Sequence, residues 1–172
     1  MKSDYITRAK KFLQQIAPLF EDCFSTADYE RVINWFNCEH NRKVICSYGL
    51  TRIALITSDH VIKFDYDQYE VKRFGGCKSE VDFYNFAKRK GYAHLFAKIT
   101  PVVVNGFTYY IMPRINGIGR YEDHYVQDYL DCDDTDFVDE YLNDMHDQNY
   151  GWKNGYPVII DYACNALTFP RA

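Results

Sequence analysis

The sequence predicts an α+β fold in which helices accompany a five-stranded antiparallel sheet. Two helical patterns lie before residue 43, five short apolar segments separated by turn residues lie between residues 44 and 112, and another helical pattern surrounds residue 137. At 172 residues and 47% hydrophobic content, the chain can bury one sizeable core. We therefore expect one compact protein built from an N-terminal helical extension (1–43), a sheet region (44–114) and a small C-terminal region (115–172).

The extension is expected to form two helices that pack on the sheet. Ser25 and Thr26 are residue types that cap helices, and they stand directly before the second pattern. The apolar positions of the two helices recur at helical spacing: Phe12, Leu13, Ile16, Leu19 and Phe20, then Tyr29, Val32, Ile33 and Phe36.

The sheet region predicts strands at residues 44–48, 53–56, 61–64, 95–104 and 107–112. Ser58-Asp59-His60 is expected to turn the chain between the second and third strands. Asn105-Gly106 is a strong hairpin dipeptide between the last two. Gly75-Gly76 interrupts the chain before an amphipathic helix that carries Glu80.

The C-terminal region is expected to be small and helical. Asp134 or Thr135 can cap a helix that places five apolar side chains on one face: Phe137, Val138, Tyr141, Leu142 and Met145. Residues 115–119 are expected to be a flexible link, and residues 156–160 form an apolar run that Asp161 ends.

The most informative pattern is Asp144-Met-His146-Asp-Gln-Asn149, followed twelve residues later by Asp161. Such a set can place a catalytic base and two metal-binding oxygens around one triphosphate. Upstream, Lys63 stands among apolar residues of a predicted strand, where it can hold the inner phosphates. Glu80 follows seventeen residues later, where it can pair with Lys63.

Over roughly residues 44 to 163 the chain resembles the protein-kinase-like superfamily. The resemblance implies a two-lobe fold with a truncated helical second lobe. It also implies that Lys63 contacts phosphate, that Glu80 is its helix partner, that Asp144 is the catalytic Asp, and that Asn149 and Asp161 bind magnesium. With His146 two residues after Asp144, the loop is similar to the D-x-H-x-x-N form of aminoglycoside and choline kinase-like enzymes.

The nucleotide-binding parts depart from the family pattern. Its glycine-rich loop is reduced to Ser-Tyr-Gly49-Leu-Thr51-Arg52, in which one glycine lets a phosphate approach the backbone. The resemblance places Met112 to Arg114 at the adenine-contacting hinge, where Pro113 lacks an N–H. Asp161-Tyr162-Ala163 keeps the carboxylate of the family's Asp-Phe-Gly and loses its glycine.

The expected function is ATP- and Mg²⁺-dependent transfer of a γ-phosphoryl group to a hydroxyl of a protein or a small molecule. One alternative is a catalytically weak kinase-fold protein that binds or inhibits a partner. Compact kinase-like chains are similar to bacteriophage proteins, so that partner would be a host protein. A second alternative is nucleotidyl transfer on the same scaffold.

Charge and composition exclude other classes. The net charge is −4, which argues against nonspecific nucleic-acid binding, and no segment approaches a membrane span or a signal peptide, so a cytoplasmic location is expected. Six cysteines without a C-x-x-C pair predict reduced thiols, and Cys38, His40 and Cys46 lack a well-spaced fourth zinc ligand. Residues 1–110 carry sixteen basic and twelve acidic groups, whereas residues 111–172 carry four and twelve. The acidic residues before Asp144 are expected to be a solvated face, with attraction of a cationic substrate as the functional hypothesis.

Overall fold

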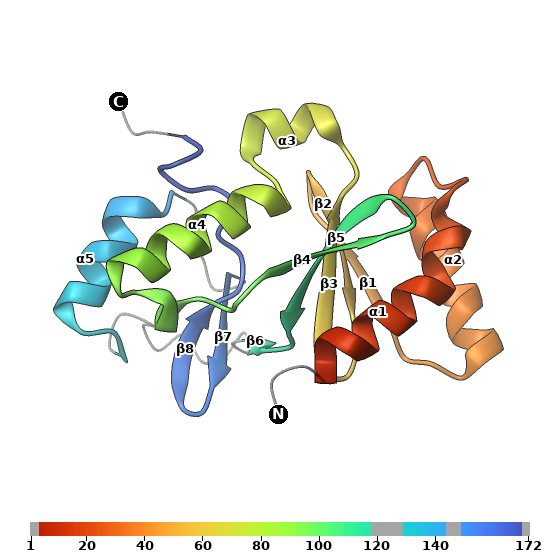
Figure 1. Cartoon of the computed structure of the whole chain (residues 1–172), viewed down its shortest axis with the longest axis horizontal. Helices are drawn as coiled ribbons and strands as arrows, with labels where there is room; N and C mark the ends of the chain where they lie inside the picture. Colours follow the sequence, from red (N-terminus) through yellow and green to blue (C-terminus); the bar gives the residue numbers. More distant parts are fainter. Residues whose placement is uncertain (1–3, 118–128, 144–148, 170–172) are drawn as a thin grey trace. The chain divides into compact units, whose positions relative to one another are not determined.

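A computed structural model describes residues 4–117, 129–143 and 149–169 of the chain. The chain divides into two compact units (Figure 1). The first comprises residues 1–71 and 100–114, and the second comprises residues 72–99 and 115–172. The two helices of residues 1–43 therefore share a unit with the sheet, whereas the helix that carries Glu80 belongs to the second unit.

The first unit contains a five-stranded antiparallel sheet, as the sequence predicts. Its strands are β1 (Ile45–Tyr48), β2 (Arg52–Ile56), β3 (His60–Asp65), β4 (Thr100–Val104) and β5 (Phe107–Pro113). The strand order is β1-β2-β3-β5-β4, so β3 is the central strand. The predicted turn at Asn105-Gly106 is confirmed, with φ angles of 51° and 80°.

The prediction that the fourth strand starts near residue 95 is wrong. Ala93–Leu95 form a 3-10 helix, η2, and β4 starts at Thr100. The intervening residues pair elsewhere, because Phe96 forms a parallel bridge to Ile159 and the Ala97 N–H donates to the Ile159 carbonyl over 2.9 Å. The predicted strand is therefore divided. Phe96 and Ala97 pair with Ile159, whereas residues 100–104 join the five-stranded sheet.

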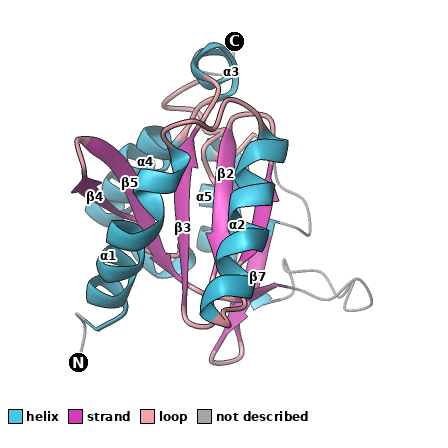
Figure 2. Cartoon of the chain, turned by 90° about the vertical axis from the view of Figure 1, so that its right-hand side faces the viewer, coloured by secondary structure: helices cyan, strands magenta, loops and turns pink. Residues whose placement is uncertain are grey.

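Two helices cover one face of the five-stranded sheet, α1 (Asp4–Ile16) and α2 (Thr26–His40), joined through the 3-10 helix η1 (Ala17–Phe20) (Figure 2). The predicted cap is confirmed, since the Ser25 hydroxyl accepts from the Asp28 N–H and the Asp28 carboxylate accepts from the Ser25 N–H. The first helix ends earlier than its apolar pattern, where Pro18 enters η1. The core between helices and sheet includes Leu13, Ile16, Ile33, Phe36, Ile53, Leu55, Ile62, Phe64 and Ile111.

The second unit contains the helices α4 (Cys77–Lys90) and α5 (Cys132–Tyr141) and a three-stranded sheet of order β6-β7-β8. Its strands are β6 (Asn116–Gly117), β7 (Tyr150–Lys153) and β8 (Tyr156–Ile159). A short helix, α3 (Gln68–Phe74), contains the boundary between the units. Phe83, Phe96, Phe137 and Tyr162 pack their rings together in this unit.

Three local predictions for the second unit need correction. Helix α5 is capped by Asp131, whose carboxylate accepts from the Asp134 N–H over 2.8 Å, and not by Asp134 or Thr135. The helix ends at Tyr141, because the Leu142 backbone turns extended and bridges Asn165. Asn116 and Gly117, expected in a flexible link, pair with β7. Met145, the last apolar position of that predicted helix, lies outside the described residues.

No helix in the part of the chain that the structure describes is both long and apolar enough to cross a membrane. All six cysteines are free thiols.

Candidate active site

Lys63 lies on the central strand of the first unit, between Ala54 of β2 and Tyr110 of β5. Neighbouring residues of a strand face opposite sides of a sheet. Because Ile62 and Phe64 belong to the core under α1 and α2, Lys63 lies on the opposite face. Only 7% of Lys63 is exposed, which is rare for a lysine. Helices α1 and α2 therefore do not cover the face of the sheet on which Lys63 lies.

The reduced glycine loop is a tight connection between β1 and β2. The Gly49 N–H donates to the Arg52 carbonyl over 3.0 Å, and the Tyr66 hydroxyl donates to the Gly49 carbonyl over 3.1 Å. The Tyr66 N–H donates to the carbonyl of the buried Thr51, also over 3.1 Å. A Cβ on Gly49 would meet no atom within 4 Å, so the fold itself does not require glycine there. Arg52 is the register partner of Asp65, on the same face as Lys63.

The expected hinge residues are tied to the β2–β3 hairpin. Met112 is buried in β5 and pairs with Val61. The Arg114 N–H donates to the Asp59 carbonyl over 3.0 Å, and its guanidinium donates to the Thr57 carbonyl over 2.8 Å. The backbone donor of Arg114 is therefore already engaged, and Pro113 has none.

The second unit brings Glu80, Asn149 and Asp161 together through hydrogen bonds on both sides of Asp161. The Ile160 N–H donates to the Asn149 carbonyl over 2.7 Å. On the other side, the Tyr162 N–H donates to Glu80 Oε1 over 3.3 Å, and Glu80 is fully buried in α4. Asp161 is thus held between the residue that ends the predicted catalytic loop and the predicted helix glutamate. Asp144 and His146 lie outside the described residues.

The chain after Asp161 is held by residues that the sequence analysis did not select. Asn165 is fully buried and donates to the carbonyls of Tyr162 and Ala163 over 2.8 and 3.1 Å. The Ser79 hydroxyl, on α4, also donates to the Ala163 carbonyl over 2.7 Å. A Cβ on Gly75, where φ is +79°, would lie 2.6 Å from that carbonyl oxygen. Only Gly75 left a signal in the sequence, as one half of a glycine pair.

The aromatic ring of Tyr162 anchors the same segment. Tyr162 is 2% exposed, and its hydroxyl donates to the Ala97 carbonyl over 2.6 Å. Burial raises the pKa of this phenol well above its ordinary value, so it stays protonated and keeps donating. The backbone next to Asp161 is therefore anchored by the buried Tyr162.

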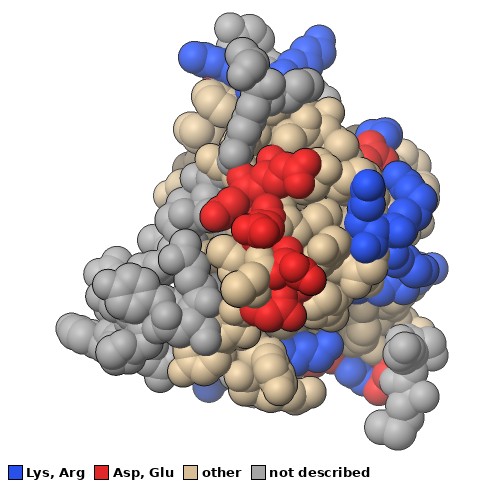
Figure 3. Space-filling model, turned by 90° about the vertical axis from the view of Figure 1, so that its left-hand side faces the viewer, with Lys and Arg blue, Asp and Glu red and all other residues tan. Residues whose placement is uncertain are grey.

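Acidic side chains gather on the surface around α5 (Figure 3). Asp133, Asp136, Asp139 and Glu140 are exposed there, whereas Asp134 is half-buried and contacts His94 over 3.1 Å. Within the described ranges, no group of three His, Cys, Asp or Glu side chains is placed to hold a metal ion. A magnesium site would instead combine Asp161 with the amide oxygen of Asn149.

No protein-family model and no curated protein matches the chain. The solved structure of the Legionella pneumophila Lpg2603 kinase bound to IP6 is similar, with a TM-score of 0.48 and 15% sequence identity over 77% of this chain and 51% of that chain. This chain thus spans about half the length of that structure.

Proposed function

We propose that the protein is an ATP- and Mg²⁺-dependent phosphotransferase, which moves the γ-phosphoryl group of ATP to a hydroxyl of a protein or a small molecule. One observation carries the proposal: Asp161 is held between Glu80 and Asn149 by the hydrogen bonds of its two neighbours, at 3.3 and 2.7 Å. Glu80 lies 81 positions before Asp161 and Asn149 lies 12 positions before it, so their meeting supports the roles that the sequence pattern assigns to them.

The donor set fits magnesium. Carboxylate and amide oxygens are hard ligands of the kind that Mg²⁺ prefers, and Asp161 and Asn149 supply one of each. When bound, the ion would offset negative charge on the phosphates. Asp161 is half-buried, so its carboxylate keeps some access to a ligand.

The remaining residues have distinct tasks in this proposal. The Lys63 ammonium attracts the inner phosphates, and the loop with Gly49, Thr51 and Arg52 offers backbone and side-chain donors to them. Asp144 orients the acceptor hydroxyl and accepts its proton. Met112 contacts the adenine through its backbone, while Arg114 positions the hairpin rather than the base.

Calorimetric titration of ATP, with and without Mg²⁺, tests the proposal. Asp161→Asn removes one charge from the metal site and should weaken Mg²⁺-dependent binding about tenfold or more, equivalent to ~1.4 kcal/mol. Asp139→Asn makes the same change at an exposed position of α5 and should leave binding within twofold. Lys63→Met should weaken ATP binding whether or not Mg²⁺ is present.

Two results would overturn the proposal. One is an absence of ATP binding by wild-type protein that circular dichroism shows to be folded. That result would favour the alternative of a kinase-fold protein that binds a partner, and a search for the partner would follow. The other is transfer of label from α-labelled rather than γ-labelled ATP, which indicates nucleotidyl transfer.

A further inference from the structure

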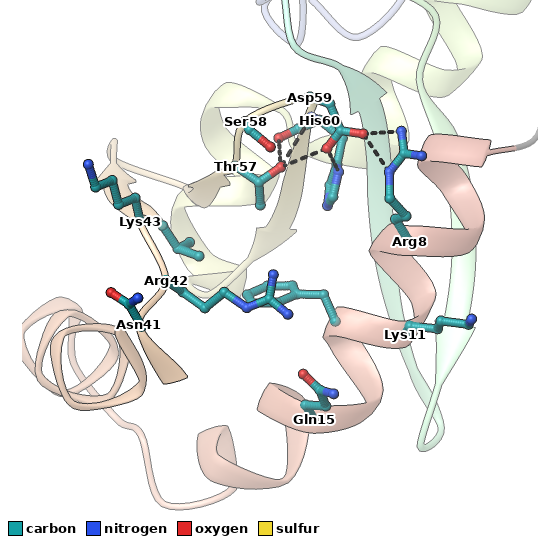
Figure 4. A pocket seen from close by; sticks show the side chains of 12 residues that line it. Arg8, Lys11, Gln15, Asn41, Arg42, Lys43, Thr57, Ser58, Asp59 and His60 are labelled. Carbon is teal, nitrogen blue, oxygen red and sulfur yellow. Dashed lines mark hydrogen bonds and ion pairs between the residues drawn. The ribbon is translucent and has the colours of Figure 1, made fainter. Parts of the chain in front are cut away.

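The first unit contains a cavity of about 710 Å³ between α1, the residues that follow α2, and the β2–β3 hairpin (Figure 4). This volume is typical of small-molecule sites. His60 lines the cavity and is on the same face of β3 as Ile62, which packs under the helices. The cavity therefore lies on the opposite face of the sheet from Lys63 and is separate from the proposed phosphotransfer site.

Four cationic side chains line this cavity: Arg8, Lys11, Arg42 and Lys43. Its single carboxylate, Asp59, is already used, because Arg8 Nε donates to it over 2.8 Å and a second guanidinium nitrogen also contacts it. No ion pair of the other three cations occurs among the described residues. In Figure 4, Arg42 extends across the cavity, and Lys11 and Lys43 stand on opposite sides of it. The cavity thus carries an excess of positive charge although the whole chain has a net charge of −4.

His60 gives a second and independent indication of a ligand. It is 4% exposed, and its Nδ1 bonds to Asp59 Oδ1 over 2.7 Å. A carboxylate only accepts, so Nδ1 carries the proton. Nε2 is buried and has no hydrogen-bond partner, and such a group requires an explanation. Figure 4 shows the ring projecting from the hairpin toward the space that Arg42 crosses.

We propose that this cavity binds a small anion that carries two or more phosphate groups. The Arg42 guanidinium suits bidentate contact with phosphate oxygens, and the ammonium groups of Lys11 and Lys43 can turn inward as point charges. The partly protonated oxygen of a phosphate can donate to His60 Nε2, and a protonated ring can donate to an anionic oxygen. Either bond satisfies the buried nitrogen. A cavity of this volume with four cationic side chains in its lining favours a small ligand over an extended polymer.

Titration calorimetry with inorganic tripolyphosphate, without Mg²⁺, tests this proposal. Wild type should bind tripolyphosphate at this cavity, and Arg42→Gln/Lys43→Gln should weaken at least tenfold the binding that Lys63→Met leaves intact. The matched control is Lys88→Gln/Arg89→Gln, which removes an adjacent Lys and Arg from exposed positions of α4 and should change affinity less than twofold. Lys11→Gln gives a second test if the first double variant fails to fold.

Two further variants separate the possible origins of binding. His60→Gln should weaken binding at least threefold, and in wild type the His60 ring nitrogen resonances should shift on addition of tripolyphosphate. Lys63→Met should keep wild-type affinity, because Lys63 lies on the other face of the sheet. The proposal is overturned by an absence of binding at millimolar tripolyphosphate, by equal losses in the two double variants, or by loss of binding in Lys63→Met.

Discussion

Asn165 offers a quantitative test of how the segment after Asp161 is held. Its amide donates to Ser79 Oγ, the Tyr162 carbonyl and the Ala163 carbonyl over 3.0, 2.8 and 3.1 Å. Its carbonyl oxygen accepts from the N–H groups of Leu167 and Thr168 over 3.1 and 3.2 Å. A buried hydrogen bond contributes about 1 kcal/mol net, and bonds that share one side chain do not add fully. We therefore expect Asn165→Ala to lower the free energy of unfolding by about 3–4 kcal/mol.

Urea unfolding followed by tryptophan fluorescence measures this change. The chain has two tryptophans, and Trp35 is half-exposed on α2. In a Trp35→Phe background, Trp152 of β7 reports on the second unit alone. Asn85→Ala is the control, because Asn85 is exposed on α4 and alanine favours a helix there by at most about 0.5 kcal/mol. If Asn165→Ala changes stability no more than the control does, the hydrogen bonds of Asn165 do not hold this segment.

Three other predictions concern individual side chains. Gly75→Ala should destabilise the second unit by about 2 kcal/mol in the same assay, because φ is +79° and the new Cβ would lie 2.6 Å from the Ala163 carbonyl oxygen; an unchanged urea midpoint would contradict the close approach. Burial lowers the pKa of His60, so below about pH 6.5 the unfolded chain binds more protons than the folded chain does. The free energy of unfolding should therefore rise between pH 5 and 7, by at most ~1.4 kcal/mol per pH unit, and His60→Gln should reduce this slope; identical slopes would refute it. With Ellman's reagent at pH 8, the exposed Cys38 should react in the folded protein, whereas Cys46, whose pKa burial raises to about 11, should react only after unfolding.

The sheet and the extension were predictable because their signals are local. Alternating apolar residues, the Asn105-Gly106 turn and the Ser25 cap each act within a few residues of themselves. Strand β7 carried a similar signal, since Asn154-Gly155, with φ of 55° and 82°, closes the hairpin between β7 and β8. That dipeptide would have revealed a second sheet.

The contacts that hold the candidate site were not predictable, because they join distant parts of the sequence. Phe96 is apolar and would fit a strand of the five-stranded sheet, but in the structure it pairs with Ile159 instead. Asn165 resembles an ordinary turn residue until Ser79 is placed beside it by the fold. Glu80 was selected because a family pattern names it, and its role in that pattern stays a prediction. Its bond to the Tyr162 N–H is a structural contact that the pattern does not contain.

The most direct test of phosphotransfer is to incubate the protein with Mg²⁺ and ATP labelled at the γ position, with α-labelled ATP in parallel. We expect γ-label to appear as phosphoprotein or free phosphate. Asp161→Asn should slow this about a hundredfold, equivalent to ~2.7 kcal/mol in the barrier, while Asp139→Asn should retain the wild-type rate. Release of γ-label at equal rates from wild type and Asp161→Asn, or no release by folded wild type that binds ATP, would contradict it.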